Sequence, residues 1–490
     1  MNAIGIDVGT TGLKAVAVDE EGSILREKTV RYPTRLAGLG AEQDARAWWR
    51  AAVEALPEVV GGEEVSGVAV TCQAPTIVCV DDDAEPLGVA LTWIDRRAHQ
   101  EAEELAGAIQ PTRNPADPYF ATGKLLWLMR HRPWEIEAAH AILCANGYIV
   151  AHLTGEFSLD ETTAGLFQGW DGDFDPALSD LVPLDLLPPV RPAMEVAGAV
   201  TKAASEITGL PEGTPVVHGG IDAIGAALEA GVFGPGDGLV EMTGFSTVVI
   251  TAAERGTHVH GMIHTRHAVG DNDLVLAAMV TAGAVTDWGV EFTGFDDPAE
   301  FDRNASEKIS TLGRPGRLLM VPALAGERTP TWDATARGAV VGLDLDVDAG
   351  DLAIAIYEGT ALGLADNFRR MEEVMGDLRP VRSVGGGSKS AAWTQIKADV
   401  LGAPVTVPKL GHGAAAGAAI LAGLATGMWP DLEAAKSITV GDGETFEPDP
   451  DMTDKYARRL ELYRELQAAL PPITRQLHEE TPERGTREKS

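Results

Sequence analysis

Cysteine, basic side chains and long apolar runs are all scarce in this sequence. Three cysteines occur among its 490 residues, none of them in a CxxC pair. We therefore expect free, buried thiols in a reducing compartment rather than a disulfide framework. No segment reaches about 18 uninterrupted strongly apolar residues, the length that a membrane-spanning helix needs. The amino terminus lacks the basic, apolar character of a secretory leader. These absences predict a cytoplasmic protein without membrane partners.

Basic side chains are also outnumbered by acidic ones. Lys and Arg total 39 against 73 Asp and Glu, which gives a formal net charge of −34. Nucleic acid and anionic lipid are bound largely through Lys and Arg, so neither is an expected partner. We interpret the acidic excess as a solvated surface of the kind that suits a high-salt cytoplasm, rather than as an acidic functional patch.

The sequence alternates between short apolar strands and helical segments, which predicts an α/β protein of two to four domains. Strands are expected at 3–6, 13–18, 23–30, 65–71, 76–80 and 215–218, and helices at 41–56, 123–132 and 223–231. The helix at 41–56 would bury Trp48, Trp49, Val53 and Leu56. Residues 172–200 are rich in proline and should be irregular.

A strand–turn–strand pattern occurs twice, at 4–18 and again at 239–251. In each copy a turn that contains Gly and Thr or Ser separates the two strands. Two such hairpins, far apart in the chain, indicate two related domains that face each other. We therefore expect a domain boundary near residue 250.

The first hairpin turn, DVGTTG at 7–12, has the chemistry of a phosphate site. Backbone N–H groups in a tight Gly-containing turn can converge on phosphate oxygens, and Thr10 and Thr11 can add hydroxyl donors. Asp7 ends a strand, where its carboxylate can reach Mg²⁺ through water. The turn is not a Walker A loop, because no GKS or GKT is present, and a strand rather than a helix follows it. An ordinary hairpin turn is the alternative.

The segment GGID at 219–222 places a carboxylate directly after an apolar strand. Phosphoryl transfer from ATP needs a base for the hydroxyl proton and cations on the phosphates. Asp222 suits that base, since the neighbouring glycines allow a substrate to approach closely. The same aspartate could instead cap the helix that is expected to begin at Ala223.

The glycine run GGGSKS at 385–390 lies between an expected strand and an expected helix, and Trp393 follows it. Bare backbone beside a helix N-terminus can accept the base or ribose of a nucleotide. A flexible loop is the alternative interpretation.

The segment WIDRR at 93–97 combines an aromatic ring, a carboxylate and guanidinium groups. Such a set could hold a polyhydroxyl substrate, although a surface ion-pair cluster with one anchoring Trp would look the same.

Two further segments are given no chemistry. The charged loop GERTPTWD at 326–333 is expected to order an interdomain surface. The histidines at 258, 260, 264 and 267 match no zinc spacing, so a loop without metal is expected there.

Taken in order, these segments resemble the FGGY family of carbohydrate kinases, within the actin-like ATPase superfamily, from about residue 3 to about residue 430. IGIDVGTTGLKAV is similar to the first phosphate motif of that family, TGFST to its second, and GGIDAIGAA to the block with its catalytic aspartate. AEQDARAWW, TWIDRR, GKLLWL and LTGEF resemble further blocks. GERTPTWDATARGAVVGL resembles the C-terminal signature, GGGSKSAAWTQIKADVLGAPV the adenosine motif, and GAAAGAAILAG its partner helix.

The resemblance implies two RNase H-like domains with a cleft between them, and ATP and Mg²⁺ as cofactors. Residues 1–250 would bind the sugar and carry the catalytic aspartate, 251–435 would bind adenosine, and 436–490 would form a C-terminal helix and a charged tail. The partners implied are a small sugar or polyol and ATP, with a homodimer as the candidate assembly.

Roles for individual residues follow from the same resemblance. Asp222 is implied as the catalytic residue, and Asp7 and Asp222 as the metal-side carboxylates. Phosphate binding is implied for Gly9, Thr10, Thr11 and Lys14 in the first turn and for Thr243, Gly244 and Ser246 in the second. Adenosine binding is implied for Gly385, Gly386, Gly387, Ser388, Lys389 and Trp393. Sugar binding is implied for Gln73, Trp93, Asp95, Arg96 and Asp222.

The resemblance is greatest to xylulokinase-like members, which implies a ketopentose such as D-xylulose as substrate. Several positions depart from the familiar patterns. Gln73 is followed by Ala-Pro-Thr, where well-known xylulokinases carry Met-His-Gly and glycerol kinases carry Arg-Glu. The WIDRR segment replaces WNDGR, and Phe245 stands where many members carry Thr. Erythritol, ribitol, ribulose, glycerol and gluconate are alternative substrates. An actin-like ATPase without kinase activity and a non-catalytic sugar sensor are alternative functions.

Overall fold

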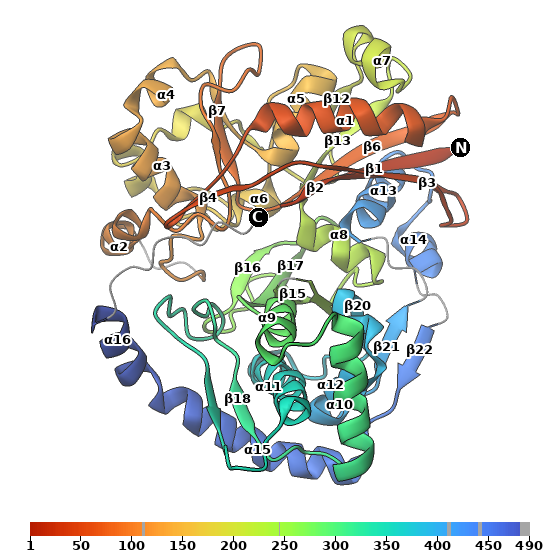
Figure 1. The fold of residues 1–490 in the computed structure, drawn as a ribbon. Helices are drawn as coiled ribbons and strands as arrows, with labels where there is room; N and C mark the ends of the chain where they lie inside the picture. Colours follow the sequence, from red (N-terminus) through yellow and green to blue (C-terminus); the bar gives the residue numbers. More distant parts are fainter. Residues whose placement is uncertain (110–112, 245, 409–412, 440–442, 481–490) are drawn as a thin grey trace.

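The computed structural model describes residues 1–109, 113–244, 246–408, 413–439 and 443–480. Two α/β domains, each built on a mixed β-sheet, lie one above the other in Figure 1. The expected α/β architecture of two domains is confirmed. No helix within these described ranges is long and apolar enough to cross a membrane.

The first sheet contains the predicted first hairpin at its centre. Its strands run in the order β12-β13-β6-β1-β2-β3. Their bounds are β1 Asn2–Val8, β2 Gly12–Asp19, β3 Ile24–Arg31, β6 Val65–Cys72, β12 Val196–Ala199 and β13 Pro215–Ile221. Strand β1 is antiparallel to β2, whereas β1, β6 and β13 are mutually parallel. The carboxyl ends of those three strands therefore meet at one edge of the sheet, which is where polar residues follow them.

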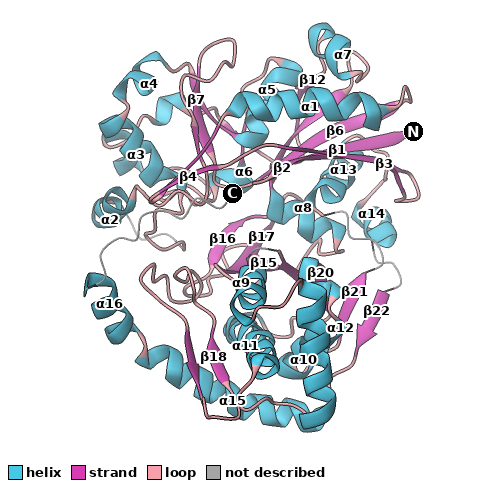
Figure 2. Ribbon diagram, in the orientation of Figure 1, coloured by secondary structure: helices cyan, strands magenta, loops and turns pink. Residues whose placement is uncertain are grey.

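Helices cover both faces of this sheet. Helices α1 (Ala45–Val60) and α5 (Ala145–Thr154) pack on one face, and α8 (Asp222–Glu229) and α13 (Ala414–Ala425) on the other (Figure 2). The helix expected at 41–56 begins later, because Gly40–Gln43 form strand β5 and the Asp44 side chain caps α1 by accepting a hydrogen bond from the Arg46 N–H. Trp48 is fully buried as expected, while Trp49 is only partly buried.

The second sheet contains the second hairpin, in the order β16-β17-β15-β14-β20-β21-β22. Its strands are β14 Leu239–Thr243, β15 Thr247–Glu254, β16 Ile263–Arg266, β17 Asn272–Met279, β20 Val381–Gly385, β21 Val405–Pro408 and β22 Gly443–Phe446. Alternate residues serve two cores, as the two-residue period of a strand requires. Leu239 and Val249 pack among the helices of the second domain, whereas Val240 and Ile250 join the core of the first. The two domains are thus packed together through this sheet.

The division between the sheets falls between β13 and β14, whereas the boundary expected near residue 250 lies inside β15. Helix α13 also crosses the expected division, because it follows the second domain in sequence yet packs beneath β1 of the first. Its glycine allows this close approach: a Cβ built on Gly417 would lie 1.8 Å from the Gly225 carbonyl oxygen of α8. The chain therefore returns to the first domain near its end.

The remaining elements build out each domain. In the first domain a five-stranded sheet, β4-β5-β8-β7-β9, packs with helices over the proline-rich region, which is irregular as predicted. These elements are β4 Arg35–Ala37, β7 Ile77–Val80, β8 Ala90–Leu91, β9 Ala141–Cys144, β10 Leu159–Asp160, β11 Val190–Arg191, α2 His99–Ala108, α3 Ala121–His131, α4 Pro133–Ala138, α6 Glu161–Ala164 and α7 Lys202–Thr208, with short 3₁₀ turns at Pro176–Asp180 and Leu184–Leu186. Later elements are α9 Gly283–Thr293, α10 Pro298–Leu312, β18 Leu319–Val321, β19 Ala339–Val341, α11 Ala349–Met375, a 3₁₀ turn at Gly386–Lys389, α12 Ala391–Leu401, α14 Leu432–Thr439, α15 Pro450–Ala469 and α16 Pro471–Glu480.

Candidate active site

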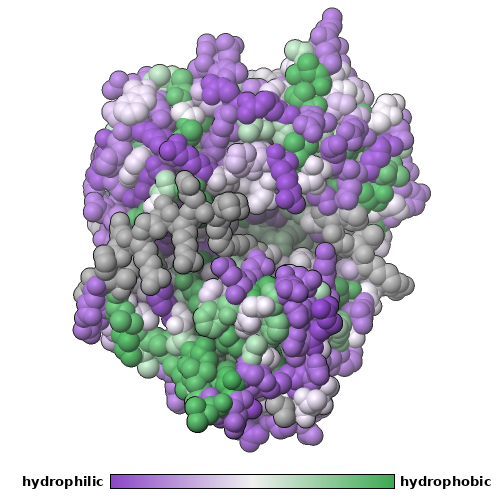
Figure 3. Space-filling model, in the orientation of Figure 1, coloured by the Kyte–Doolittle hydropathy of each residue, from purple (hydrophilic) through white to green (hydrophobic). Residues whose placement is uncertain are grey.

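A cavity of about 330 Å³ lies between the two domains. Figure 3 shows the surface hollowed between the upper and lower halves of the molecule. The first domain contributes Thr10, Trp93, Tyr119 and Asp222 to its wall, and the second contributes Gly244, Ser246, Arg328 and Gly385. Predicted sugar, base and phosphate residues thus meet in one place, although they lie far apart in the sequence.

Two carboxylates lie at the carboxyl edge of the first sheet, and one of them, Asp222, lines this cavity. Asp7 is at the end of β1, and Asp222 begins α8 directly after β13. Strands β1 and β13 are parallel, and β6 lies between them in the sheet. Burial raises the pKa of Asp7 to about 6, against the opposing hydrogen bond from the Thr71 hydroxyl at 3.0 Å. Burial and then the nearby charge of Asp7 raise the pKa of Asp222 to about 7. This is the electrostatic pattern of a functional carboxylate pair.

Asp222 does not act as the N-cap of α8, which was the alternative that the sequence left open. The N-cap residue is Ile221, and it makes no side-chain capping bond. Asp222 is the first residue of the helix and is partly exposed to the cavity. Asp222 is therefore placed beside the space that a ligand would occupy.

The first hairpin turn is held from its carbonyl side. The Gly9 carbonyl accepts a hydrogen bond from the Tyr32 hydroxyl at 2.7 Å, and the Thr10 carbonyl accepts from the side chains of Thr34 and Gln43, each at 2.8 Å. Within the described ranges, no hydrogen bond uses the backbone N–H groups of Thr10 and Thr11. A turn anchored in this way leaves its N–H groups for an anion, as the phosphate interpretation requires.

Two other residues of the first turn have defined surroundings. The Thr10 hydroxyl accepts a hydrogen bond from the Trp93 indole N–H at 2.9 Å, so the turn is bonded directly to the sugar-side wall. Lys14 faces Asp7 across the hairpin, but its ammonium group pairs with Glu27 at 2.9 Å. Its charge still opposes the rise in the pKa of Asp7.

The second turn is shorter and differs in the fate of its threonine. Gly244 N–H bonds to the Ser246 carbonyl at 2.9 Å, and both residues line the cavity. The Thr243 side chain is buried instead, where its hydroxyl bonds to Glu241 and lies 2.7 Å from the Thr247 hydroxyl. Thr243 could therefore contact phosphate only through its backbone. Phe245, the unexpected residue of this turn, lies outside the described residues.

Beneath the second turn lies a buried ionic network. The Glu241 carboxylate accepts hydrogen bonds from the Ser383 hydroxyl at 2.5 Å and from the Lys397 ammonium group at 2.9 Å. The same ammonium group lies 4.8 Å from the centre of the Trp393 ring. This network joins the floor of the second turn to the helix that follows the glycine run.

The glycine run borders a second cavity of about 570 Å³ in the second domain. Its walls include Gly386, Gly387, Lys389 and Trp393, and its other residues come chiefly from α9 and α10. The Trp393 ring stacks on Tyr357 at 4.9 Å. Among the other predicted adenosine residues, Gly385 borders the central cavity, and the Ser388 hydroxyl bonds to the Gly385 carbonyl at 2.8 Å. The cavity meets the central one at Gly244, as a nucleotide spanning both would require.

The predicted sugar residues are separated by the structure. Trp93 lines the central cavity, but Asp95 and Arg96 do not. Asp95 is fully buried and accepts hydrogen bonds from the Ala41 N–H and from Arg97, while Arg96 forms a two-pronged ion pair with Asp117. In the structure, Asp95 and Arg96 therefore take part in ion pairs, which was the alternative interpretation of the WIDRR segment. Their role toward a sugar would be to fix the loop that carries Trp93.

Gln73 is also buried beside the first turn. Its backbone N–H bonds to the Val8 carbonyl at 2.9 Å, and its side-chain N–H bonds to the Gln43 oxygen at 2.6 Å. The Gln73 side-chain oxygen has no hydrogen-bond partner among the described residues.

One residue of the cavity wall was missed by the sequence reasoning. Arg328 belongs to the GERTP segment, which was expected to order a surface and to have no direct chemistry. The structure instead places Arg328 in the wall of the central cavity. The available signal was the charged pair Glu327-Arg328 a few residues after the apolar strand β18, a place where a charge needs a reason.

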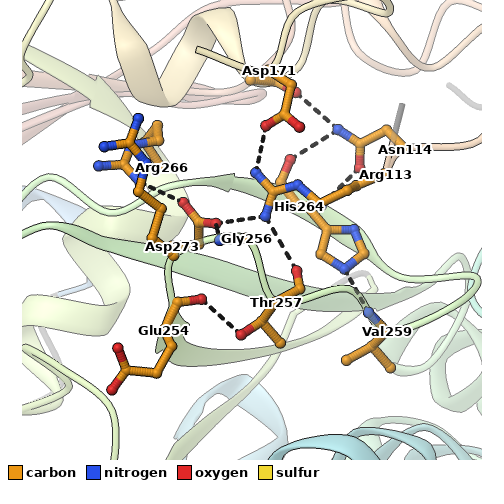
Figure 4. Close-up of polar contacts among 12 residues, drawn as sticks. Arg113, Asn114, Asp171, Glu254, Gly256, Thr257, Val259, His264, Arg266 and Asp273 are labelled. Carbon is orange, nitrogen blue, oxygen red and sulfur yellow. Dashed lines mark hydrogen bonds and ion pairs between the residues drawn. The ribbon is translucent and has the colours of Figure 1, made fainter. Parts of the chain in front are cut away.

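Among the described residues, no group of three or more His, Cys, Asp or Glu side chains could hold a metal ion. His264 lies on β16 in a polar joint between the domains (Figure 4). Its side chain accepts a hydrogen bond from the Val259 N–H at 3.0 Å. Beside it, Arg113 of the first domain bonds to Asp273 of β17 at 2.5 Å and to Asp171 at 2.8 Å.

Comparison with known proteins connects this geometry to one family. The models for the N-terminal and C-terminal domains of the FGGY family of carbohydrate kinases match residues 2–229 and 242–426. The xylulose kinase of Escherichia coli (strain K12) is 28% identical, over 96% of this chain and 99% of its own. A glycerol kinase of Trichlorobacter lovleyi is 29% identical, over 87% and 90% of the two chains.

Solved structures agree with the sequence comparisons. The crystal structure of xylulose kinase from Rhodospirillum rubrum superposes with a TM-score of 0.84 and 27% sequence identity, covering 97% of this chain and all of the other. The fold is therefore the two-domain, actin-like ATPase fold of such kinases, as the sequence implied.

Proposed function

The chain belongs to the FGGY family of carbohydrate kinases, and from that premise we propose that it transfers the γ-phosphate of ATP to a hydroxyl group of D-xylulose or a similar ketopentose. The observation that carries the proposal is the placement of Asp222. A carboxylate with a pKa raised to about 7 lies between the sugar-side Trp93 and the two phosphate turns. The names of the relatives support a ketopentose, since xylulose kinases match over nearly the whole chain.

In the proposed reaction the sugar hydroxyl oxygen forms a bond to the γ-phosphorus while its proton passes to a carboxylate oxygen of Asp222. The bond from the γ-phosphorus to the bridging oxygen breaks, and ADP leaves. A base works best when its pKa lies near the working pH, and Asp222 meets that condition. The backbone N–H groups of the first turn would hold phosphate oxygens during the transfer.

Asp7 and Asp222 also fit a Mg²⁺ ion that travels with ATP. The charge of Asp7 raises the pKa of Asp222 when no cation is near, and oxygen ligands are those that Mg²⁺ prefers. When bound, the ion would neutralise charge on the phosphate oxygens. The adenosine would occupy the cavity beside Gly386 and Trp393.

A panel assay tests the substrate class. Coupled ADP release is measured with pentuloses, pentitols, tetritols, glycerol and aldonates, each with and without the Asp222→Asn substitution. A ketopentose should give the highest kcat/KM, and the substitution should remove that signal. Glycerol as the best substrate would replace the ketopentose assignment, which matters because a glycerol kinase is among the relatives. ADP release that no compound in the panel stimulates would contradict the kinase proposal itself.

The location proposed for the enzyme is the cytoplasm. All three cysteines are free and buried, as expected for a reducing compartment.

A further inference from the structure

The guanidinium group of Arg328 is buried without an acceptor. The residue is 5% exposed, and its Nε is fully buried with no hydrogen-bond partner. No described residue accepts a hydrogen bond from its terminal nitrogens or forms an ion pair with them. Buried charged groups in folded proteins are almost always paired or hydrogen-bonded, because desolvation of a bare charge is costly. An arginine that breaks this rule inside a ligand cavity has donors that are available to the ligand.

Two aromatic rings flank the guanidinium. The group lies 5.1 Å from the centre of the Trp93 ring and 5.5 Å from that of Tyr119, both on the first domain. Arg328 itself comes from the second domain, on the loop between β18 and β19. The aromatic rings attract the cation but accept no conventional hydrogen bond from it, so its N–H donors remain available. Arg328 lines the same cavity as Asp222.

The loop on either side of Arg328 is fixed. The Glu327 carboxylate accepts hydrogen bonds from the N–H groups of Val280 and Arg328, both at 2.9 Å, and among the described residues it forms no ion pair with the guanidinium. The Thr329 hydroxyl accepts a hydrogen bond from the Ala278 N–H at 2.7 Å. These contacts dock the loop against the end of β17. The side chain is therefore preorganised without an intrinsic acceptor, which is the arrangement of a binding residue.

We propose that Arg328 is a specificity-determining residue whose guanidinium binds two neighbouring oxygens of the sugar. This proposal rests on the sugar kinase activity proposed above. The substrate class that it predicts has two adjacent oxygens, either two hydroxyls or a carbonyl and a hydroxyl. Two parallel N–H groups of a guanidinium match such a pair of oxygens, whereas an ammonium group offers only a point charge. Because Trp93 and Tyr119 lie on the opposite domain, a sugar held by Arg328 bridges both halves of the cleft.

The test uses the full chain with the best sugar from the panel. Arg328→Gln and Arg328→Lys are compared with wild type in steady-state kinetics, and sugar binding is measured by calorimetry without nucleotide. A lost hydrogen bond to a charged donor corresponds to a change of about 10- to 100-fold. We expect KM and Kd for the sugar to rise by that amount in the Gln variant and by less in the Lys variant, while KM for ATP changes less than about twofold. Arg337→Gln is the matched control, since Arg337 lies on the same loop outside the cavity and should leave these constants unchanged.

A deoxy analogue of the sugar, which lacks one hydroxyl of that adjacent pair, sharpens the test. Wild type should lose efficiency with the analogue, whereas the Gln variant should treat sugar and analogue alike. A lower kcat with unchanged sugar affinity would overturn the proposal and assign Arg328 to the transferred phosphate. A large fall in thermal stability with unchanged kinetics would also overturn it, because removal of an unpaired buried charge should not destabilise the protein. Failure of the kinase proposal is distinct, since it would leave no sugar-dependent turnover in wild type.

Discussion

The two hairpins that face each other across the cleft share a layout and differ in the fate of one carboxylate. In the first domain Asp7 of β1 pairs in register with Thr71 of β6, whose hydroxyl bonds to it. In the second domain Glu241 of β14 pairs with Ser383 of β20, whose hydroxyl does the same. Asp7 is partly exposed, whereas Glu241 is 1% exposed and joined to Lys397.

The difference teaches which hairpin carries chemistry. Within the described residues Asp7 forms no ion pair, so its carboxylate remains available to a cation. Glu241 has its charge neutralised by Lys397 of α12, and its other bonds hold Ser383 and Thr243 in place. We therefore infer that one structural unit serves the proposed reaction in the first domain and supports the proposed nucleotide site in the second.

The largest expected effect comes from Asp222, the second carboxylate of the first domain. Asp222→Asn removes the proposed base and should lower kcat by about 10²- to 10⁴-fold, the usual contribution of general-base catalysis. ATP affinity should persist, because the adenosine cavity lies in the other domain. Steady-state kinetics and calorimetry with ATP measure the two quantities. Turnover close to wild type would show that Asp222 is not the base. It would also contradict the proposed division between reactive carboxylates in the first domain and a structural carboxylate in the second.

The second prediction sets Lys397→Met against Asp7→Asn. Loss of Lys397 leaves Glu241 buried and unpaired, which should cost about 3–5 kcal/mol of unfolding free energy. Asp7→Asn replaces a carboxylate whose pKa is already raised by burial, so stability should be maintained while turnover falls. Denaturant unfolding and kcat are measured for both. Equal losses of stability in the two variants would contradict the division between a structural and a reactive carboxylate.

The contrast also predicts opposite responses to pH. Asp222 must be ionised to accept a proton, so kcat/KM should fall about tenfold per pH unit below its pKa of about 7. Stability should change in the other direction. The folded pKa values of Asp7 and Asp222 exceed the ordinary value of 3.8, so the protonated carboxyl groups contribute to the unfolding free energy. That contribution is complete below pH 3.8 and is lost as the pH rises toward about 6 for Asp7 and about 7 for Asp222.

Variants separate the groups that cause this slope. Unfolding free energies from pH 4 to pH 8 should slope less steeply in Asp222→Asn than in wild type. Part of the slope should persist, because burial also raises the pKa of Glu327 to about 7. An identical slope in wild type and variant would show that the Asp222 carboxylate does not titrate as proposed.

The features of the two hairpins and of the site that could be predicted from the sequence are those set by residues close together in the chain. Both hairpins, Asp222 after an apolar strand and the glycine run follow from short-range patterns, because strand period and turn residues are set by neighbours in the chain. Whether a charged side chain faces the cavity or an ion-pair partner depends on distant residues. Asp95 therefore looked like a sugar ligand, whereas its buried partners come from a separate strand and from Arg97.

Arg328 is the converse case, a charged residue that lines the cavity although its sequence context does not predict that position. Its loop offers only charge and proline in sequence, and its place in the cavity arises from the docking of that loop on β17. The return of α13 to the first domain is likewise a long-range packing event that composition alone does not specify.

The fourth prediction tests the nucleotide side of the cleft at the glycine run. Gly386 borders the cavity proposed for adenosine, and the nearest atom that a Cβ there would meet beyond its chain neighbours is the Thr243 carbonyl oxygen at 3.9 Å. Gly386→Val should therefore fold normally but weaken ATP binding by about tenfold, or about 1.4 kcal/mol, with sugar affinity unchanged. Gly387→Ala is the contrasting variant, since its Cβ would lie 2.6 Å from the Thr243 side chain and should lower thermal stability instead. Unchanged ATP affinity in Gly386→Val by calorimetry would place adenosine elsewhere.

The smallest effect is expected from the hydroxyl groups of the second turn. Ser246 lines the central cavity, whereas the Thr243 hydroxyl is turned into the buried network of Glu241. Ser246→Ala should lose one hydrogen bond to a phosphate, about 0.5–1.5 kcal/mol, and so lower kcat/KM for ATP by about two- to tenfold. Thr243→Val should leave the phosphate contacts alone and lower the unfolding free energy, because it leaves acceptors of the network without a donor. If Thr243→Val instead lowered kcat/KM for ATP at unchanged stability, the second turn would use its threonine as the first turn uses Thr10, and the two hairpins would be more alike than their carboxylates indicate.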